Sequence, residues 1–307
     1  MNIILPITVT AAMLQSGTTI AEPAPGETAW VASATYAVGD LRIRATTHRV
    51  YSCVQGHTGR TALPESDAAY WLDKEPTQRH APFDVYTTTA AKTTGSLTYV
   101  LQPGFFNALS FYGLIGASLA VTVKDAPGGT AIYSKTVELY AQAAGLYELL
   151  FSPLRQITRI VLSDIPISPS AELTIVVNAG AGLPVALGMA NVGDYRRVIG
   201  ASAWGGTEYG ASADPKSYSY IKFFDDGTSL IKRRGSATDM RGSVLLPAEE
   251  AASAVDLVQQ VLDVPVSCVA TDAAGYDYLN VFGLLSGSMT AATHNTANFA
   301  FSVKGFL

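Results

Sequence analysis

Histidine is the commonest protein metal ligand, and four histidines are spread along this 307-residue chain. They are His48, His57, His80 and His294. Their separations do not match a metal-ligand motif, and the sequence contains no His-Glu-x-x-His, Cys-x-x-Cys or EF-hand pattern. His48 and His57 flank one aromatic segment, and unpaired surface histidines are more common than ligands. The spacing predicts no metal site and no cofactor.

Adjacent carboxylates offer a second kind of chemistry, and the sequence has two such pairs, Asp225-Asp226 and Glu249-Glu250. Glycoside hydrolysis needs two carboxylates that face each other across a cleft. The first pair is placed to form a turn and the second to begin a helix, so folding explains both. No Gly-x-Ser-x-Gly elbow, phosphate-binding loop or dinucleotide-binding glycine pattern occurs. These observations predict a protein that is not an enzyme, although carboxylates that converge from distant segments stay an open alternative.

A dense group of aromatic residues lies between residues 29 and 73, including two of the three tryptophans. Gly39-Asp40 predicts a turn that leads into a strand at 41–43, and a second strand is expected at 49–54. A segment this short buries little apolar area, so large rings must supply most of its core. The rings concerned are Trp30, Tyr36, Tyr51, Tyr70 and Trp71.

This segment resembles the small chitin-binding modules of the carbohydrate-binding type 5/12 class. The matching positions are Ala29-Trp30, Tyr36, Gly39-Asp40, Ile43, Tyr51, Pro64 and Trp71. The resemblance implies carbohydrate binding by Trp30, Tyr36, Tyr51, Tyr70 and Trp71. The sequence departs from the pattern at Gln55-Gly56-His57, where such modules present adjacent exposed aromatic residues. Two interpretations therefore stay open: the rings bind sugar, or they are the core of the module.

Composition excludes several classes of protein. Charged residues make up 15% of the chain and hydrophobic residues 48%, which is typical of folded domains and not of disordered chains. The net charge is −5 and no long basic run occurs, which argues against a nucleic-acid partner. The densest basic positions, Arg196-Arg197 and Lys232-Arg233-Arg234, are expected to be surface charges of hairpins.

The first residues and the cysteines set further expectations. Residues 1–20 lack the basic start and the continuous apolar run of a signal peptide, and no window reaches the length of a membrane span. We expect a soluble chain without an export signal. Residues 2–10 predict an extended arm that pairs at a sheet edge. Cys53 and Cys268 fall in different predicted domains, and two separate buried thiols are favoured over a disulfide.

Residues 85–180 predict a β-sandwich, because short strand-like runs alternate with turn residues. Strands are expected at 97–101, 107–112, 118–124, 131–138, 147–151, 157–162 and 173–177. Their order resembles galactose-binding-like jelly-roll domains. This resemblance implies either sugar binding through loops at one end or a spacer role, and the spacer is favoured.

Residues 181–307 predict a β-rich α+β domain with one helix. Strands at 218–224 and 229–234 flank Asp225-Asp226-Gly227, which favours a hairpin with a type I′ turn. A helix is expected at 247–262, with Pro247 in its first turn and an apolar stripe of Ala254, Val255, Val258 and Leu262. Further strands are expected at 241–246, 265–269, 276–285 and 298–307.

The arrangement of this last third resembles a group of bacteriophage tail and baseplate proteins. The matching features are Asp194-Tyr195, the hairpin at 222–234, the helix at 247–262, Val281-Phe282-Gly283 and the ending from Phe301 to Leu307. Many of these proteins also carry a small sugar-binding-like module near the N-terminus. The resemblance implies a virion protein of the tail or baseplate that is assembled in the cytoplasm of a bacterial host.

The predicted organisation is an arm and linker at 1–26, a carbohydrate-binding-like module at 27–75, a linker at 76–84, the sandwich at 85–180 and a tail-assembly domain at 181–307. The predicted function is a structural subunit of a tail tip or baseplate. Its expected partners are other tail proteins, further copies of itself and host surface glycans. A free carbohydrate-binding protein, or an accessory module of a polysaccharide-degrading system, is the alternative. The apolar ends predict that at least one terminus crosses to a neighbouring subunit.

Overall fold

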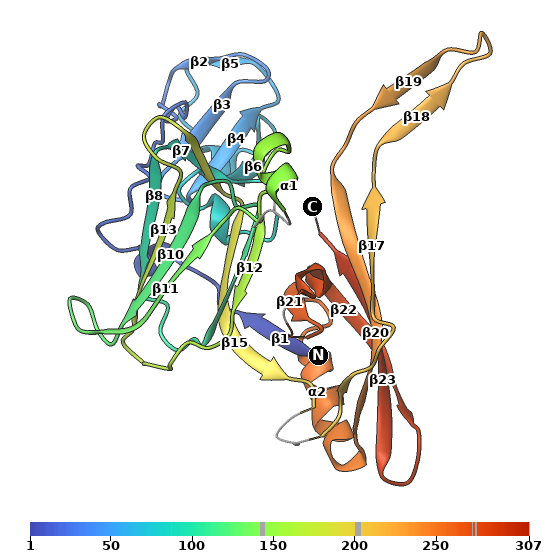
Figure 1. The fold of residues 1–307 in the computed structure, drawn as a ribbon. Coiled ribbons are helices and arrows are strands. Elements are labelled where there is room, and N and C mark those ends of the chain that lie inside the picture. The colour runs from blue at the N-terminus through green and yellow to red at the C-terminus, as the bar shows by residue number, and fades with distance from the viewer. Residues whose placement is uncertain (87, 142–144, 200–203, 272, 274, 307) are drawn as a thin grey trace.

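Strands dominate the structure, a computed structural model that describes all residues except 87, 142–144, 200–203, 272, 274 and 307 (Figure 1). This confirms the prediction of a mainly β fold. Within the described residues, no helix is both long enough and apolar enough to cross a membrane. Cys53 and Cys268 are both buried free thiols, as predicted.

A 10-stranded antiparallel sheet runs through the described part of the chain. Its strands, in spatial order, are β12 (Arg159–Leu162), β9 (Ala108–Tyr112), β15 (Met189–Arg197), β1 (Asn2–Pro6), β21 (Val266–Val269), β22 (Asn280–Ala291), β23 (Thr296–Gly305), β20 (Ser236–Pro247) and β16 (Gly206–Thr207), with β17 (Ser212–Ser217) also paired to β20. Because β9 and β12 belong to the predicted sandwich, this sheet continues across the boundary expected near residue 180.

Strand β1 lies in the middle of this sheet, where the sequence predicts an edge. It pairs with β15 on one side and with β21 on the other, so both rows of its backbone groups are used. Ile3 and Ile4 are fully buried, on opposite faces of the strand. The expectation of an edge arm was wrong, because buried positions on both faces indicate a central strand.

The opposite end of the chain also stays within its own fold. Strand β23 pairs with β20 and β22, and the Phe306 ring lies 6.3 Å from the Phe282 ring. The prediction that a terminus crosses to a neighbour is therefore wrong for both of these strands. Leu307 lies outside the described residues.

A sandwich forms where a second sheet packs on β9 and β15. That sheet contains β11 (Ala131–Glu138), β10 (Ser118–Lys124), β13 (Glu172–Asn178) and β8 (Ser96–Leu101), and the pair β7 (Ala91–Thr94) and β14 (Pro184–Leu187) completes the core. Buried and partly buried residues alternate along β10 and β13, as expected for strands with one face in a core. Six of the seven predicted strands are confirmed. The galactose-binding-like assignment stays a prediction.

The seventh predicted strand, at 147–151, is instead the helix α1 (Leu146–Phe151). The reason is the spacing of its large side chains. Tyr147 and Phe151 are four residues apart, and their rings lie 5.1 Å from each other, as neighbours on one helical face do. Their β propensity alone had indicated a strand.

The aromatic module contains a three-stranded sheet of β3 (Leu41–Arg44), β4 (Arg49–Cys53) and β6 (Trp71–Pro76), beside the short pair β2 (Thr35–Tyr36) and β5 (His57–Thr58). Both strands predicted in this segment are confirmed. Five single-turn 3₁₀ helices connect the described elements: Ala11–Met13, Pro64–Ser66, Ala81–Phe83, Ala248–Glu250 and Asp277–Leu279.

The predicted long helix is α2 (Ala251–Gln260), which follows the 3₁₀ turn Ala248–Glu250. Ala254 and Val258 are buried as predicted, whereas Leu262 is 45% exposed and Val261 takes the buried position. The prediction for Leu262 was wrong because the helix ends before it, which changes the direction of the chain.

Strands β18 (Tyr220–Phe223) and β19 (Ser229–Lys232) form the predicted hairpin. Its turn is not type I′, because only Gly227 among the turn residues has a positive φ, of 80°. The Phe224 N–H donates to the Thr228 carbonyl at 2.9 Å, which leaves three residues between them. A three-residue loop with glycine in the left-handed position fits this geometry.

Replacing Ile3 with Ala tests the central position of β1. Ile3 is fully buried against the C-terminal core, so Ile3→Ala should lower the free energy of unfolding by about 2–5 kcal/mol. Ile132→Ala on β11 is the matched control, and it should cost less than about 1 kcal/mol because Ile132 is partly exposed. Chemical denaturation followed by circular dichroism measures both. Equal losses in the two variants would contradict a buried β1.

Candidate functional site

Three of the five predicted sugar-binding residues form the core of the aromatic module. Tyr36, Tyr51 and Trp71 are only 2–5% exposed and pack around Cys53. A sugar ring needs an exposed aromatic face, and these rings offer none. For these three residues the position in the structure fits the core interpretation.

Trp30 and Tyr70 are half-buried, and each is partly covered by an arginine from its own module. The Arg44 guanidinium lies 5.2 Å from the Trp30 ring, and Glu65 holds it through two contacts of 3.2 Å. The Arg60 guanidinium lies 3.7 Å from the Tyr70 ring. Guanidinium groups are attracted to the negative face of an aromatic ring, so these contacts stabilise the module. They also occupy ring surface that a glycan would need.

His57 occupies the place where the sequence departs from the chitin-binding pattern. Its ring lies 5.3–5.5 Å from the rings of Tyr36, Tyr70 and Trp71, each time close to perpendicular or steeply inclined. Such edge-to-face packing is favourable for aromatic groups. His57 thus adds to the ring cluster and does not present an exposed aromatic platform.

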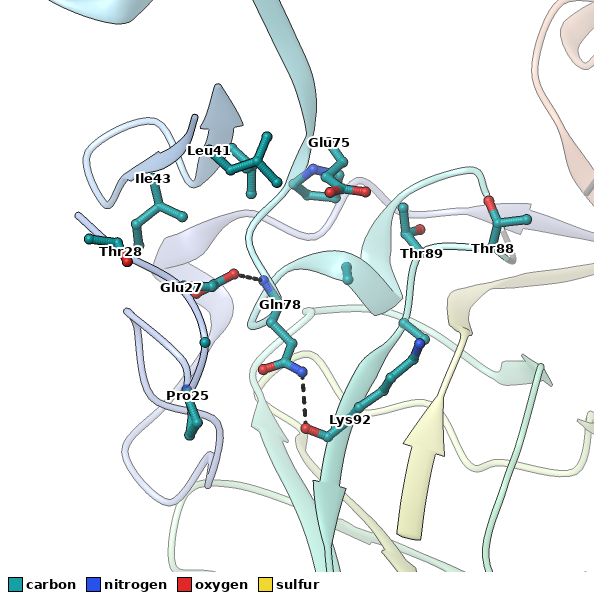
Figure 2. Close-up of a pocket in the computed structure, with 15 residues that line it drawn as sticks. Pro25, Glu27, Thr28, Leu41, Ile43, Glu75, Gln78, Thr88, Thr89 and Lys92 are labelled. Atoms are coloured by element: carbon teal, nitrogen blue, oxygen red, sulfur yellow. Dashed lines mark hydrogen bonds between the residues drawn. The ribbon is translucent and has the colours of Figure 1, made fainter. Parts of the chain in front are cut away.

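A cavity of about 380 Å³ lies between the aromatic module and the sandwich (Figure 2). Sequence reasoning did not predict it, because its walls come from four separate segments. They are Pro25–Thr28, the module strands with Leu41, Ile43, Val50, Glu75 and Pro76, the connection with Gln78 and Ala81, and the segment with Thr88, Thr89, Ala90 and Lys92.

Hydrogen bonds hold one wall of this cavity together. The Glu27 carboxylate accepts from the Gln78 backbone N–H at 2.7 Å, and the Gln78 side chain donates to the Lys92 carbonyl at 3.0 Å (Figure 2). Glu75, Lys92 and three threonines contribute charged and hydroxyl groups, while no aromatic residue is among its described lining. The cavity can take a polar ligand through hydrogen bonds, without ring stacking.

The hairpin of residues 218–234, here called the projecting hairpin, carries several exposed large apolar side chains. Figure 1 shows it extending well beyond the rest of the chain. All described residues of β18 and β19 are exposed. Its large apolar side chains are 41–76% exposed, and they are Tyr218, Tyr220, Ile221, Phe223, Phe224, Leu230 and Ile231. An isolated two-stranded hairpin is only marginally stable in water, so a partner surface would stabilise it.

Helix α1 presents a second exposed apolar surface. Leu146, Tyr147, Leu150 and Phe151 are 62–75% exposed. Isolated exposed apolar residues are normal, but four within one short helix form a patch. The sequence indicated these residues only as a strand of the sandwich.

The two acidic pairs have local structural roles. Asp226 accepts hydrogen bonds from the Thr228 N–H at 2.9 Å and from its hydroxyl at 2.7 Å, and these bonds hold the pKa of Asp226 below its usual range. Glu249 and Glu250 lie in the 3₁₀ turn before α2. The absence of enzymatic activity stays a prediction.

Two of the four histidines, which the sequence analysis treated as unpaired, lie side by side in the structure. His48 and His80 are 32 residues apart in the sequence, but their ring centroids lie 4.0 Å apart, with the rings tilted by 31°, beside the carboxylate of Glu22. Spacing along the chain gave no sign of this, because three different segments supply the three groups.

Comparison with known proteins gives only weak structural likeness. No protein-family model matches the chain, and no curated protein does. Among solved structures, it is similar to a selenomethionine-labelled mutant of chitosan-binding module 1 from a chitosanase/glucanase of Paenibacillus sp. IK-5. The identity is 10% and the TM-score 0.25, over 37% of this chain and 82% of that one. A likeness this weak does not establish a shared fold.

Truncating Trp71 should destabilise the module more than truncating Trp30. Trp71→Ala removes a buried ring and should cost about 3–5 kcal/mol, and Trp30→Ala should cost less because its ring is half-exposed. Leu72→Ala, on the neighbouring exposed position of β6, is the control and should change little. Hydrogen exchange of the peptides from residues 29–76 measures the local stability. Unchanged protection in both tryptophan variants, with loss of chitin binding, would instead support the sugar-binding interpretation.

Proposed function

We propose that this chain is a structural subunit of a phage tail tip or baseplate. In this proposal the C-terminal part, with the projecting hairpin, docks on further copies or on other tail proteins. The aromatic module and the sandwich face outward, where they contact host surface glycans. The chain is assembled in the bacterial cytoplasm, becomes part of the virion, and has no catalytic role.

The observation that carries the proposal is the exposure of the projecting hairpin. Seven large apolar side chains on one extended element are far from any core of the same chain. Burying an apolar side chain of this size is worth about 1.5–3 kcal/mol, so a partner that covers several of them would gain considerable stability. The Lys222 ammonium, 5.1 Å from the Phe224 ring, keeps positive charge on the same surface. A specific protein contact fits such a combination better than a free surface does.

The last third of the chain resembles tail and baseplate proteins, and for this reason we assign the projecting hairpin to docking within a tail or baseplate. The hairpin, α2 and the final strand occur in the order on which that resemblance rests. The aromatic module near the N-terminus also fits this resemblance, because many such proteins carry a small sugar-binding-like module there.

A free carbohydrate-binding protein is the second candidate function, and the cavity between the module and the sandwich favours it. Its carboxylate, ammonium and hydroxyl groups suit the hydrogen bonds that sugar hydroxyls make. The two functions differ in mass in solution, because a ring-forming subunit self-associates and a free lectin need not.

The double variant Ile221→Ser/Ile231→Ser tests the role of the hairpin. These residues face each other across β18 and β19, and both are more than half exposed, so the change should leave the fold intact. Light scattering over a range of concentrations should show multimers for the wild type and a shift toward the 32.3 kDa monomer for the variant.

Ile167→Ser/Leu183→Ser removes two equally exposed apolar groups from loops elsewhere and serves as the control. It should assemble like the wild type. A wild type that stays monomeric at all concentrations would reject the ring-forming proposal and favour the free carbohydrate-binding protein.

A further inference from the structure

Glu22, His48 and His80 come together at the junction of three segments. Glu22 belongs to the N-terminal segment, His48 to the turn between β3 and β4, and His80 to the connection after β6. The His48 Nδ1 lies 2.8 Å from the Glu22 Oε2, and the His80 Nδ1 lies 3.8 Å from the Glu22 Oε1. The centroids of the two tilted imidazole rings lie 4.0 Å apart.

These groups are close enough to share one ion. One nitrogen from each ring and one carboxylate oxygen all lie within 4.8 Å of one another. Zinc binds histidine nitrogen and carboxylate oxygen at about 2.0–2.2 Å, so its tetrahedral ligands lie about 3.3–3.5 Å apart. A bound ion would draw the three atoms from their present separation to that spacing. Two histidines with one glutamate is also an established zinc ligand set.

The surroundings favour an ion more than a network of hydrogen bonds alone. His80 is only 9% exposed, and its Nε2 has no hydrogen-bond partner among the described residues.

Thr77 holds the carboxylate in place. Its hydroxyl donates to the Glu22 Oε1 at 2.6 Å and lies 3.3 Å from the His80 Nδ1. Hydrogen bonds of this kind orient the ligands of protein metal sites.

We propose that Glu22, His48 and His80 bind a divalent transition-metal ion of the zinc class, which fastens the aromatic module to the sandwich. The neighbours of the site explain this role. Ile20 and Ala24, on either side of Glu22, pack in the sandwich core, whereas His48 belongs to the module. Arg79, next to His80, donates to the Ile20 carbonyl at 3.2 Å and accepts from the Tyr99 hydroxyl at 3.0 Å through its own carbonyl.

The ion would also fix the walls of the cavity beside it. Glu27 and Gln78, which are hydrogen-bonded in that wall, follow Glu22 and Thr77 closely in the chain. Metal binding would thus set the orientation of the module and the shape of the cavity together.

Zinc titration of the full-length chain tests the site. The protein is purified without a polyhistidine tag, stripped with a chelator and titrated with zinc sulfate in a calorimeter. We expect one zinc ion per chain for the wild type. Glu22→Gln, His48→Gln and His80→Gln should each weaken binding at least tenfold, whereas His294→Gln, at an exposed histidine elsewhere, should bind like the wild type.

Two measurements on the wild type keep the test decisive if a variant fails to fold. Cobalt in place of zinc should give the visible absorption of a tetrahedral site, and zinc should slow hydrogen exchange in residues 20–27, 47–50 and 76–82. No stoichiometric zinc binding, or binding without any change of exchange in these three segments, would overturn the proposal. The cluster would then be a hydrogen-bonded network only.

Discussion

Strand β1 hydrogen-bonds to β15 on one side and to β21 on the other, and the large sheet is continuous because of it. Strand β15 belongs to the sandwich core, and β21 to the core around α2. Five residues from the start of the chain therefore join two hydrophobic cores that are built mostly from residues far away in sequence. Ladder hydrogen bonds are directional and the buried backbone must be paired, so the register of β1 fixes how the two parts meet.

Side chains near this junction add to the constraint. Ser110 of β9 and Ser267 of β21 are fully buried with their hydroxyl oxygens 2.6 Å apart, and Asn191 of β15 donates to Ser267 at 2.9 Å. Gly193 is required on β15, because a Cβ there would come within 2.1 Å of the Leu5 carbonyl oxygen. A satisfied polar contact in a buried position penalises any shift of the strands, since a shift would leave these groups unpaired.

The aromatic module is stabilised in a different way, because so small a unit has little apolar area to bury. It combines buried rings with arginines that cover the partly exposed ones, and carboxylates hold those arginines in place. The result is a stable unit whose aromatic mass is used internally. The proposed functions therefore rest on the polar cavity at its border with the sandwich and on the projecting hairpin, and not on these rings.

Alternating and periodic patterns along the chain determined the strands of the sandwich, the helix α2 and the hairpin, because these depend on which neighbours in sequence are apolar. The aromatic positions determined the core of the module, although the same residue types equally suited a sugar-binding face. The burial of Tyr36, Tyr51 and Trp71 fits a core role. The sequence could not indicate this burial or the cover that Arg44 and Arg60 give to Trp30 and Tyr70, because both depend on contacts in space.

Only the tertiary structure could place β1 and bring together the three groups of the proposed metal site. A five-residue apolar strand looks the same in sequence whether it lies at an edge or in the centre, since the difference is the number of neighbours it pairs with. Glu22, His48 and His80 have no shared motif, because folding brings three separate segments to one point. The sequence determines which residues are buried locally, and long-range pairing decides which distant residues meet.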